Sequence, residues 1–270
     1  MSGLLIFGCG KMGGAFLNGA LKNGQSPDGI RVVEPNAEIR ASLKNMNVIA
    51  AETPEPFSDF CPDAVFVAVK PFLIENIIND VKAFTDKGAV LLSIVAGRPV
   101  AWFEEKLGKT AAIVRAMPNT PAAVGRGITG IFANKAVSDE QKKYVKSLLN
   151  ACGDTLELDN ENLMDAVTAV SGSGPAYVFY LTEALAQAAE ATGLNRADAE
   201  RLARSTVVGA AELMRQSPET PETLRKNVTT PNGTTAAALA VLTDENSGFA
   251  PLMTKAVKAA EKRSKELATA

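Results

Sequence analysis

The sequence contains no histidine and only three cysteines among its 270 residues. Cys9, Cys61 and Cys152 lie far apart, so we expect neither a disulfide framework nor a zinc site, and no other metal. Histidine is the commonest general acid-base in enzymes. Any proton transfer by this chain must therefore use hydroxyls, carboxylates, lysine, water or the substrate's own proton.

Strong net charge and long apolar runs are also missing. The formal net charge is -2, which gives no electrostatic reason to expect a nucleic acid or a membrane surface as partner. The longest apolar stretches, 64–69 and 89–96, are far shorter than a membrane-spanning helix, and no signal-peptide pattern opens the chain. We therefore expect a cytoplasmic globular protein with one large domain or two smaller ones.

The first stretch of the chain combines a short apolar run, a glycine-rich turn and the start of a helix. Leu4 to Phe7 fits a strand that is buried on both faces. Gly8, Gly10 and Gly13 keep the spacing G-x-G-x-x-G, which permits a tight turn, close approach of a pyrophosphate and close helix-to-strand packing. The helix start supplies free N–H groups to the phosphates. We predict a dinucleotide site; the alternative is an ordinary strand-to-helix turn.

Glu34 ends a second apolar run, 30–33, roughly twenty residues beyond the glycine turn. In this architecture an acid at that place accepts hydrogen bonds from the adenine ribose hydroxyls, and its charge would repel a ribose phosphate. Glu34 therefore favours NADH over NADPH. The alternative is a solvated glutamate at the end of a strand.

Strand and helix signals alternate through the first part of the chain and then change character. Further strands are predicted at 64–69, 89–95, 113–117, 128–132 and 155–158, with helices between several of them. After residue 160 the strand signals disappear and alanine-rich helical periodicity takes over. We expect an α/β fold: a Rossmann-type dinucleotide-binding domain over 1–160, then an all-helical domain over 161–270. The apolar faces of these helices suggest a subunit interface.

Several residues follow directly after predicted strands, where parallel sheets bind ligands. Lys70 stands just after one buried strand, and Ala96 and Gly97 make a small-residue turn after the next. Two prolines bracket Asn119 and Thr120 and can hold these polar side chains in place. The alternatives are a surface lysine and ordinary turns.

Five motifs in combination make the whole chain resemble pyrroline-5-carboxylate reductase. They are G-C-G-K-M-G at 8–13, V-K-P at 69–71, M-P-N-T-P at 117–121, S-G-S-G-P-A-Y at 171–177 and K-N-V-T at 226–229. The resemblance implies reduction of 1-pyrroline-5-carboxylate to L-proline, the last step of proline synthesis, with NADPH or NADH as cofactor. It also implies that the helical domain intertwines in a homodimer, and family members often assemble such dimers into larger rings.

The resemblance also assigns residues to the site, and Thr235 and Lys70 become the candidate catalytic groups. It places the pyrophosphate on the turn formed by Gly8, Cys9, Gly10, Lys11, Met12 and Gly13. It places the nicotinamide beside Val69, Lys70, Pro71, Ala96 and Gly97, with Asn227 reaching the cofactor from a neighbouring subunit. The substrate carboxylate is expected at Gly233, Thr234 and Thr235, with Asn119 and Thr120 also on the substrate side. Thr235 would offer its hydroxyl to the ring nitrogen.

Two parts of the chain depart from the family pattern. Thr230 and Asn232 stand where the family's Ser-Pro-Gly-Gly-x-Thr loop has Ser and Gly. Glu34 replaces the small polar or basic residue of family members that prefer NADPH.

Two other functions stay open. One is another imine or hydroxyacid reductase of the same architecture. Hydroxyacid dehydrogenases need an acid-base lysine near the start of the long helix between the domains, and 171–180 contains no lysine. The other is a nucleotide-binding regulator that keeps the fold without turnover.

Overall fold

The computed structural model describes residues 3–268, which form two compact units. The first unit comprises the chain up to Gly172 together with its last part from Ala260, and the second is Ser173–Ala259. The boundary expected from the sequence, at residue 160, marks only where the strands end. The short helix α6 (Met164–Val167) and the π-helix Thr168–Gly172 still belong to the first unit, because α6 packs on β7 and continues into the π-helix.

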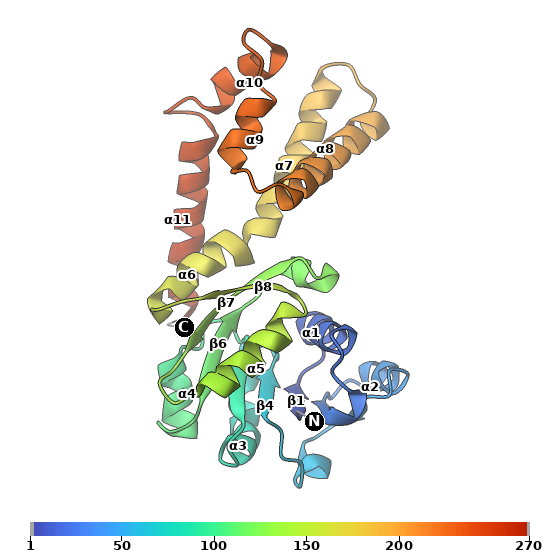
Figure 1. Cartoon of the computed structure of the whole chain (residues 1–270), viewed down its shortest axis with the longest axis vertical. Coiled ribbons are helices and arrows are strands. Elements are labelled where there is room, and N and C mark those ends of the chain that lie inside the picture. Colours follow the sequence, from blue (N-terminus) through green and yellow to red (C-terminus); the bar gives the residue numbers. More distant parts are fainter. Residues whose placement is uncertain (1–2, 269–270) are drawn as a thin grey trace. The chain divides into compact units, whose positions relative to one another are not determined.

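An eight-stranded sheet forms the centre of the first unit (Figure 1). Its strands are β1 (Leu4–Phe7), β2 (Ile30–Val33), β3 (Ile49–Ala51), β4 (Ala64–Val67), β5 (Val90–Ser93), β6 (Ile113–Met117), β7 (Gly127–Ala133) and β8 (Gly153–Glu157). The spatial order is β3-β2-β1-β4-β5-β6-β7-β8, and only the β6–β7 pair is antiparallel. The chain builds outward from β1 to β3, then returns to the other side of β1 with β4. Open α/β sheets bind ligands at such a switch point.

Helices cover both faces of this sheet, so its central strands are buried on both sides as predicted. They are α1 (Lys11–Lys22), α2 (Ala37–Lys44), α3 (Ile74–Thr85), α4 (Val100–Leu107) and α5 (Asp139–Asn150). Alternate strand residues enter two separate apolar clusters, one with α1, α2 and α5 and the other with α3 and α4. In the first cluster Phe16 stacks on Phe66 with ring centroids 4.0 Å apart. At the start of α5 the side chains of Ser138 and Gln141 form a capping box.

Short 3-10 helices follow several strands and carry parts of the predicted site. They span Pro27–Gly29, Glu55–Phe57, Pro71–Leu73, Thr120–Val124 and Glu161–Leu163. Two of them begin directly after Lys70 and Asn119. The loops predicted at these residues to bind ligands are therefore single tight turns. These turns lie at the carboxyl ends of β4 and β6.

The second unit is entirely helical in the part of the chain that the structure describes. Its helices are α7 (Gly174–Ala191), α8 (Arg196–Gln216), α9 (Pro221–Asn227), α10 (Thr234–Leu242) and the first part of α11 (Phe249–Ala268). A turn through Gly193, at φ 101°, joins α7 to α8, and these two helices pack on each other through Ala186, Ala199 and Ala203. The rest of α11 belongs to the first unit, where Ser264 Oγ donates to Asp165 Oδ1 at 2.6 Å.

None of the described helices has both the length and the apolar character needed to cross a membrane.

Candidate dinucleotide site and anion loop

The glycine turn between β1 and α1 requires glycine at two positions for steric reasons. Gly8 has φ 86°, in the left-handed region, and its N–H donates to the Val33 carbonyl at 2.9 Å. A Cβ atom on Gly13 would lie only 2.2 Å from the Gly8 carbonyl oxygen. The first turn of α1 can therefore rest directly on the end of β1 only because Gly13 lacks a side chain.

Gly10 has a different role, because nothing in the protein crowds it. It is the N-cap of α1 with φ -67°, no side chain caps the helix, and an added Cβ would meet no atom within 4 Å. The first intrahelical bond joins Gly14 N–H to the Gly10 carbonyl at 2.7 Å. The N–H groups of Lys11, Met12 and Gly13 precede that bond and have no intrahelical acceptor, as at any helix start. The open face at Gly10 fits a pyrophosphate.

Glu34 is fixed at the end of β2 and connects two turns. It is only 7% exposed. Its Oε2 accepts from Cys9 N–H at 2.7 Å, and its Oε1 accepts from Asn36 N–H at 2.9 Å. The main-chain carbonyl of Glu34 accepts from Arg40 at 2.7 Å. The sequence placed Glu34 beside the adenine ribose; in the structure its carboxylate also holds the glycine turn against the β2–α2 turn.

Cys9 has no reactive role in this geometry. Burial, together with the nearby Glu34 carboxylate, raises the pKa of the Cys9 thiol to about 11. A thiol with such a pKa is protonated at neutral pH and is a poor nucleophile. Cys9 therefore contributes its backbone N–H, which bonds to Glu34.

The residues predicted beside the nicotinamide follow β4 and β5, whose ends are neighbours in the sheet. Val67 of β4 is paired with Ser93 of β5. Lys70 is exposed, with its Nζ 5.8 Å from the ring centroid of Phe72. Gly97 has φ 73°, so the Ala96–Gly97 turn needs a residue that tolerates the left-handed region.

Val69 and Pro71 flank Lys70 after β4. A Cβ added to Gly8 would lie 3.1 Å from Val69 Cγ1, so this segment borders the glycine turn. Pro71 opens the 3-10 helix that follows. The segment 69–71, the glycine turn and the β5 turn therefore lie along one edge of the sheet.

Asn119 and Thr120 differ in exposure: Asn119 is buried and Thr120 is exposed. Asn119 is 9% exposed, and its Oδ1 accepts from Ile128 N–H at 3.0 Å. This bond fixes the turn after β6, which is the ordinary structural role weighed against substrate binding. Thr120 is exposed at the first position of the 3-10 helix.

The loop before α10 in the second unit has the geometry of a candidate anion site. Gly233 is the helix N-cap without a side-chain cap, and a Cβ there would lie 2.4 Å from Thr230 Oγ1. The first intrahelical bond is Ala237 N–H to the Gly233 carbonyl at 3.2 Å, so the N–H groups of Thr234 and Thr235 precede it. Free N–H groups and two hydroxyls at the start of a helix fit a carboxylate.

Asn232 stands in this loop where the family pattern has glycine, and its backbone conformation is compatible with that replacement. Its φ is 60°, in the left-handed region. Asparagine is among the few non-glycine residues that adopt this conformation readily. The loop can therefore turn at Asn232 in the way that a glycine would allow.

Asn227 ends α9 and is exposed. Its amide Nδ2 lies 3.2 Å from Glu219 Oε2, within the same unit. The contact orients the amide, and the cofactor contact that the resemblance assigns to Asn227 stays a prediction.

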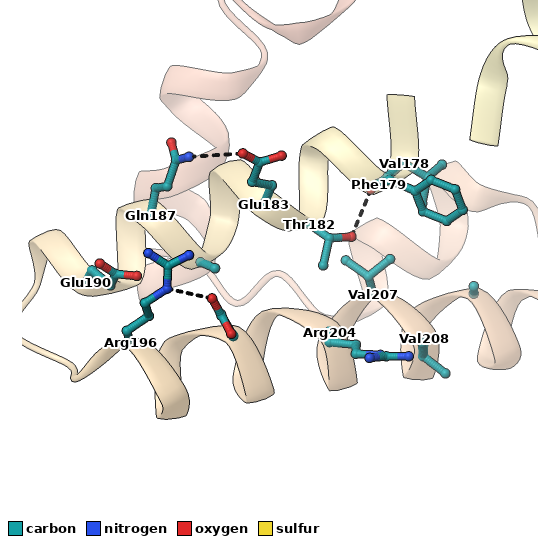
Figure 2. A pocket seen from close by; sticks show the side chains of 13 residues that line it. Val178, Phe179, Thr182, Glu183, Gln187, Glu190, Arg196, Arg204, Val207 and Val208 are labelled. Atoms are coloured by element: carbon teal, nitrogen blue, oxygen red, sulfur yellow. Dashed lines mark hydrogen bonds and ion pairs between the residues drawn. The ribbon is translucent and has the colours of Figure 1, made fainter. Parts of the chain in front are cut away.

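A groove of about 670 Å³ lies between α7 and α8 (Figure 2). Apolar residues line one part of it, and Val178, Phe179 and Val208 are each at least 46% exposed. The remainder of its lining is largely charged or polar: Thr182, Glu183, Gln187, Glu190, Arg196, Glu200 and Arg204. Arg196 of α8, labelled in Figure 2, pairs with Glu200, with Nε and Oε1 2.8 Å apart.

Sequence analysis missed two residues near the site, Arg115 and Glu161. Arg115 Nη1 lies 2.7 Å from Glu161 Oε1, and the same oxygen accepts from Val100 N–H at 2.8 Å. Arg115 lies two residues before the M-P-N-T-P motif, inside a strand whose other residues are mainly apolar. A charged residue in such a strand signals a buried partner, although it does not identify it.

The described residues contain no group of three or more acidic, cysteine or histidine side chains that could hold a metal. The fold, the switch point and the open helix start define the chain as a protein of the dinucleotide-binding α/β class. Residues 4–97 match the family described as NADP oxidoreductase, coenzyme F420-dependent.

Residues 161–267 match the family described as pyrroline-5-carboxylate reductase dimerisation. The pyrroline-5-carboxylate reductase of Pseudomonas aeruginosa is 38% identical over 98% of this chain and 96% of its own length. The chain therefore belongs to the pyrroline-5-carboxylate reductase family.

Solved structures of the same family are similar to this chain over nearly its whole length. The Coxiella burnetii pyrroline-5-carboxylate reductase superposes with a TM-score of 0.93 at 35% identity, covering 98% of each chain. The Plasmodium falciparum pyrroline carboxylate reductase, solved with NADP bound, superposes with a TM-score of 0.82 at 32% identity over 99% of this chain and 98% of its own.

Two alanine substitutions separate the packing role of Gly13 from the binding role of Gly10. In Gly13→Ala the new Cβ collides with the Gly8 carbonyl, so both the melting temperature and dinucleotide affinity should fall. In Gly10→Ala the Cβ fits the free protein but occupies the face predicted for the pyrophosphate. Its melting temperature should stay near the wild-type value while the Kd for NADH or NADPH rises about tenfold or more.

Thermal unfolding and calorimetric titration measure the two effects. Gly209→Ala in α8, where a Cβ also meets no atom within 4 Å, is the matched control and should bind the dinucleotide normally. Wild-type affinity in Gly10→Ala would show that the pyrophosphate lies elsewhere.

Proposed function

We propose that the protein reduces 1-pyrroline-5-carboxylate to L-proline with NADH or NADPH. The observation that carries the proposal is the open α1 start at Gly10, a pyrophosphate cradle, in a chain matching this reductase family over nearly its whole length. The Gly233–Thr235 loop supports a substrate with a carboxylate. When bound, the reduced nicotinamide supplies the hydride that converts the C=N carbon of the pyrroline to a C–H carbon.

The protein's own groups bind and orient the two reactants. The N–H groups at the start of α1 hold the pyrophosphate, and Glu34 holds the turn in shape through Cys9. Val69, Lys70 and Pro71 lie on the nicotinamide side together with the Ala96–Gly97 turn. The exposed Lys70 ammonium adds positive charge for the anionic substrate and cofactor. Positioning of this kind can account for a large part of the rate enhancement in a hydride transfer.

Thr235 is our candidate for the group that completes the ring N–H. Hydride addition to carbon leaves an electron pair on nitrogen, and that nitrogen must gain one proton unless the imine arrives protonated. The chain has no histidine, and Thr235, a half-buried residue at the second position of α10, carries a hydroxyl. Water then returns the proton to Thr235.

Glu34 supports NADH as the preferred cofactor. Its carboxylate is fixed at the end of β2 by two backbone N–H groups and cannot swing away from an incoming ribose. Each oxygen still has a lone pair for a ribose hydroxyl. A 2′-phosphate would meet this negative charge at close range.

We also propose a homodimer that uses the groove between α7 and α8. Phe179 is 68% exposed and Val208 61% exposed in the single chain, a large apolar surface for a monomer. The residues that match the dimerisation family include both helices. A ring of such dimers and a cytoplasmic location stay predictions.

The alternative functions predict different behaviour in one assay. Another imine or hydroxyacid reductase would oxidise the cofactor with its own substrate and not with the pyrroline. A nucleotide-binding regulator would bind the dinucleotide without turnover.

The assay of activity and cofactor choice follows absorbance at 340 nm. On addition of 1-pyrroline-5-carboxylate we expect oxidation of NADH, with a kcat/KM higher for NADH than for NADPH. Glu34→Gln removes the charge and keeps one of the two acceptor oxygens. The lost backbone bond affects both cofactors alike, so the ratio of kcat/KM should shift toward NADPH. No turnover with either cofactor would reject the proposed function, and a higher kcat/KM for NADPH would reject the role of Glu34 in selection.

The role of Thr235 is tested by removing and then restoring its hydroxyl. Thr235→Ala should lower kcat/KM about a hundredfold if the hydroxyl donates in the transition state. Thr235→Ser keeps the donor and should retain most of the activity. Unchanged kinetics in Thr235→Ala would leave proton supply to water or to the protonated substrate.

The homodimer is tested by light scattering on the intact protein. Wild type should have twice the mass of one chain, or a higher even multiple of it if dimers assemble further. Phe179→Asp puts a charge on the exposed apolar surface and should give monomers. Phe72→Asp changes an equally exposed phenylalanine in the other unit, 70% exposed, and should leave the mass unchanged. A monomeric wild type would contradict the proposal.

A further inference from the structure

Glu161 joins three segments of the first unit that are far apart in the sequence. It lies in the 3-10 helix Glu161–Leu163, after β8. Its Oε1 accepts from Arg115 Nη1 of β6 at 2.7 Å and from Val100 N–H of α4 at 2.8 Å. The Arg115 and Glu161 side chains are only 13% and 20% exposed. A carboxylate this sheltered is held in one position by both donors.

The bond to Val100 caps the start of α4 from a distance. The residue at the N-cap of α4 is Pro99, which offers no side-chain cap. The carboxylate of Glu161 satisfies the N–H of the first helical residue instead, and its negative charge suits the positive end of the helix dipole. Glu161 therefore caps the start of α4, a role that a neighbouring Asp or Ser side chain has in most helices.

The start of α4 is also one end of the Ala96–Gly97 turn. At the other end of this turn, Ile94 N–H donates to the Val67 carbonyl at 3.1 Å, and Val95 N–H donates to Ser93 Oγ at 3.2 Å. The backbone between these anchors passes through the left-handed Gly97, at φ 73°. The turn thus spans only a few residues between a fixed β5 and a helix start that Glu161 holds.

We propose that Glu161 is a positioning residue of the reductase, which holds the Ala96–Gly97 turn where it can border the nicotinamide. The inference rests on the proposed function, which puts this turn beside the nicotinamide. Glu161 touches neither reactant and acts through Val100 and the start of α4. Arg115, on the strand β6 that leads to the Asn119 turn, keeps the carboxylate in place.

The position of Glu161 predicts a loss confined to the nicotinamide half of the cofactor. Glu161→Ala removes the acceptor for Val100 N–H and should lower kcat about ten- to a hundredfold, as small misplacements of reacting groups do. It should also weaken binding of the reduced dinucleotide about tenfold, since the nicotinamide loses part of its contact surface. Binding of ADP, or of its 2′-phosphate if the enzyme uses NADPH, should stay within about twofold, because the glycine turn is untouched.

A conservative variant and a matched control separate positioning from general stability. Glu161→Gln keeps an oxygen for Val100 N–H and should restore most of the dinucleotide affinity, while its missing charge lowers thermal stability. Glu157→Gln removes the charge of another glutamate of the first unit, which pairs with Lys142 and Lys146. It should lose stability without changing kcat or either affinity.

Calorimetric titration with ADP and with the reduced dinucleotide, alongside steady-state kinetics and thermal unfolding, distinguishes the outcomes. Selective loss of dinucleotide affinity in Glu161→Ala, rescued by Glu161→Gln, supports the proposal. Equal losses for ADP and dinucleotide, or wild-type kcat and affinities in a folded Glu161→Ala, overturn it. If Glu161→Ala does not fold, Glu161→Asp serves in its place, because its shorter side chain keeps the charge but draws the carboxylate away from Val100 N–H; the same selective loss is expected and the same outcomes are decisive. Wild-type turnover with the pyrroline is measured separately, so failure of the proposed function is recognised on its own.

Discussion

The first unit depends on one close backbone contact, the packing of α1 on the end of β1. Gly13 has room only for a hydrogen where a Cβ would stand 2.2 Å from the Gly8 carbonyl oxygen. This contact brings the first N–H groups of α1 to the switch point between β2 and β4. The pyrophosphate site, the connection through Glu34 and the neighbouring β4 loop all take their positions from it. A helix set even slightly further out would direct its free N–H groups away from the sheet edge.

Much of this arrangement could be predicted from local sequence patterns. The apolar runs identified the buried strands, and the glycine spacing identified the turn, because both follow from residues near each other in the chain. The role of Glu161 could not be predicted in this way. Its partners Val100 and Arg115 are 61 and 46 residues away, and only the folded sheet brings them to one carboxylate. Local patterns of residues indicate turns and strand ends, whereas hydrogen-bond partners far apart in the sequence meet only in the folded chain.

Glu34 and Asn119 illustrate a second limit of sequence analysis. Their positions in the fold were predicted, but their side chains also bond to the protein's own backbone, Glu34 to Cys9 and Asn36, and Asn119 to Ile128. A polar residue at a ligand crevice can shape the crevice, contact the ligand, or do both. For Glu34 the two roles are compatible, because a carboxylate accepts about four hydrogen bonds. The bonds that hold Glu34 in place also keep its charge at a fixed position.

The second unit differs from the first in its packing, because few residues of its helices are buried within the single chain. Helix α10 consists of nine residues, mostly alanine, leucine and valine, and none of them is buried within the single chain. An isolated helix of this length is marginal in water, and most helical stability in proteins comes from packing of an apolar face. The Gly233–Thr235 loop takes its shape from this helix. Burial of α10 against a second chain would therefore stabilise the helix and the anion loop together. Because a partner that binds only the folded form stabilises it by mass action, a proposed homodimer that also covered α10 would link the order of the proposed substrate loop to the assembly of the protein.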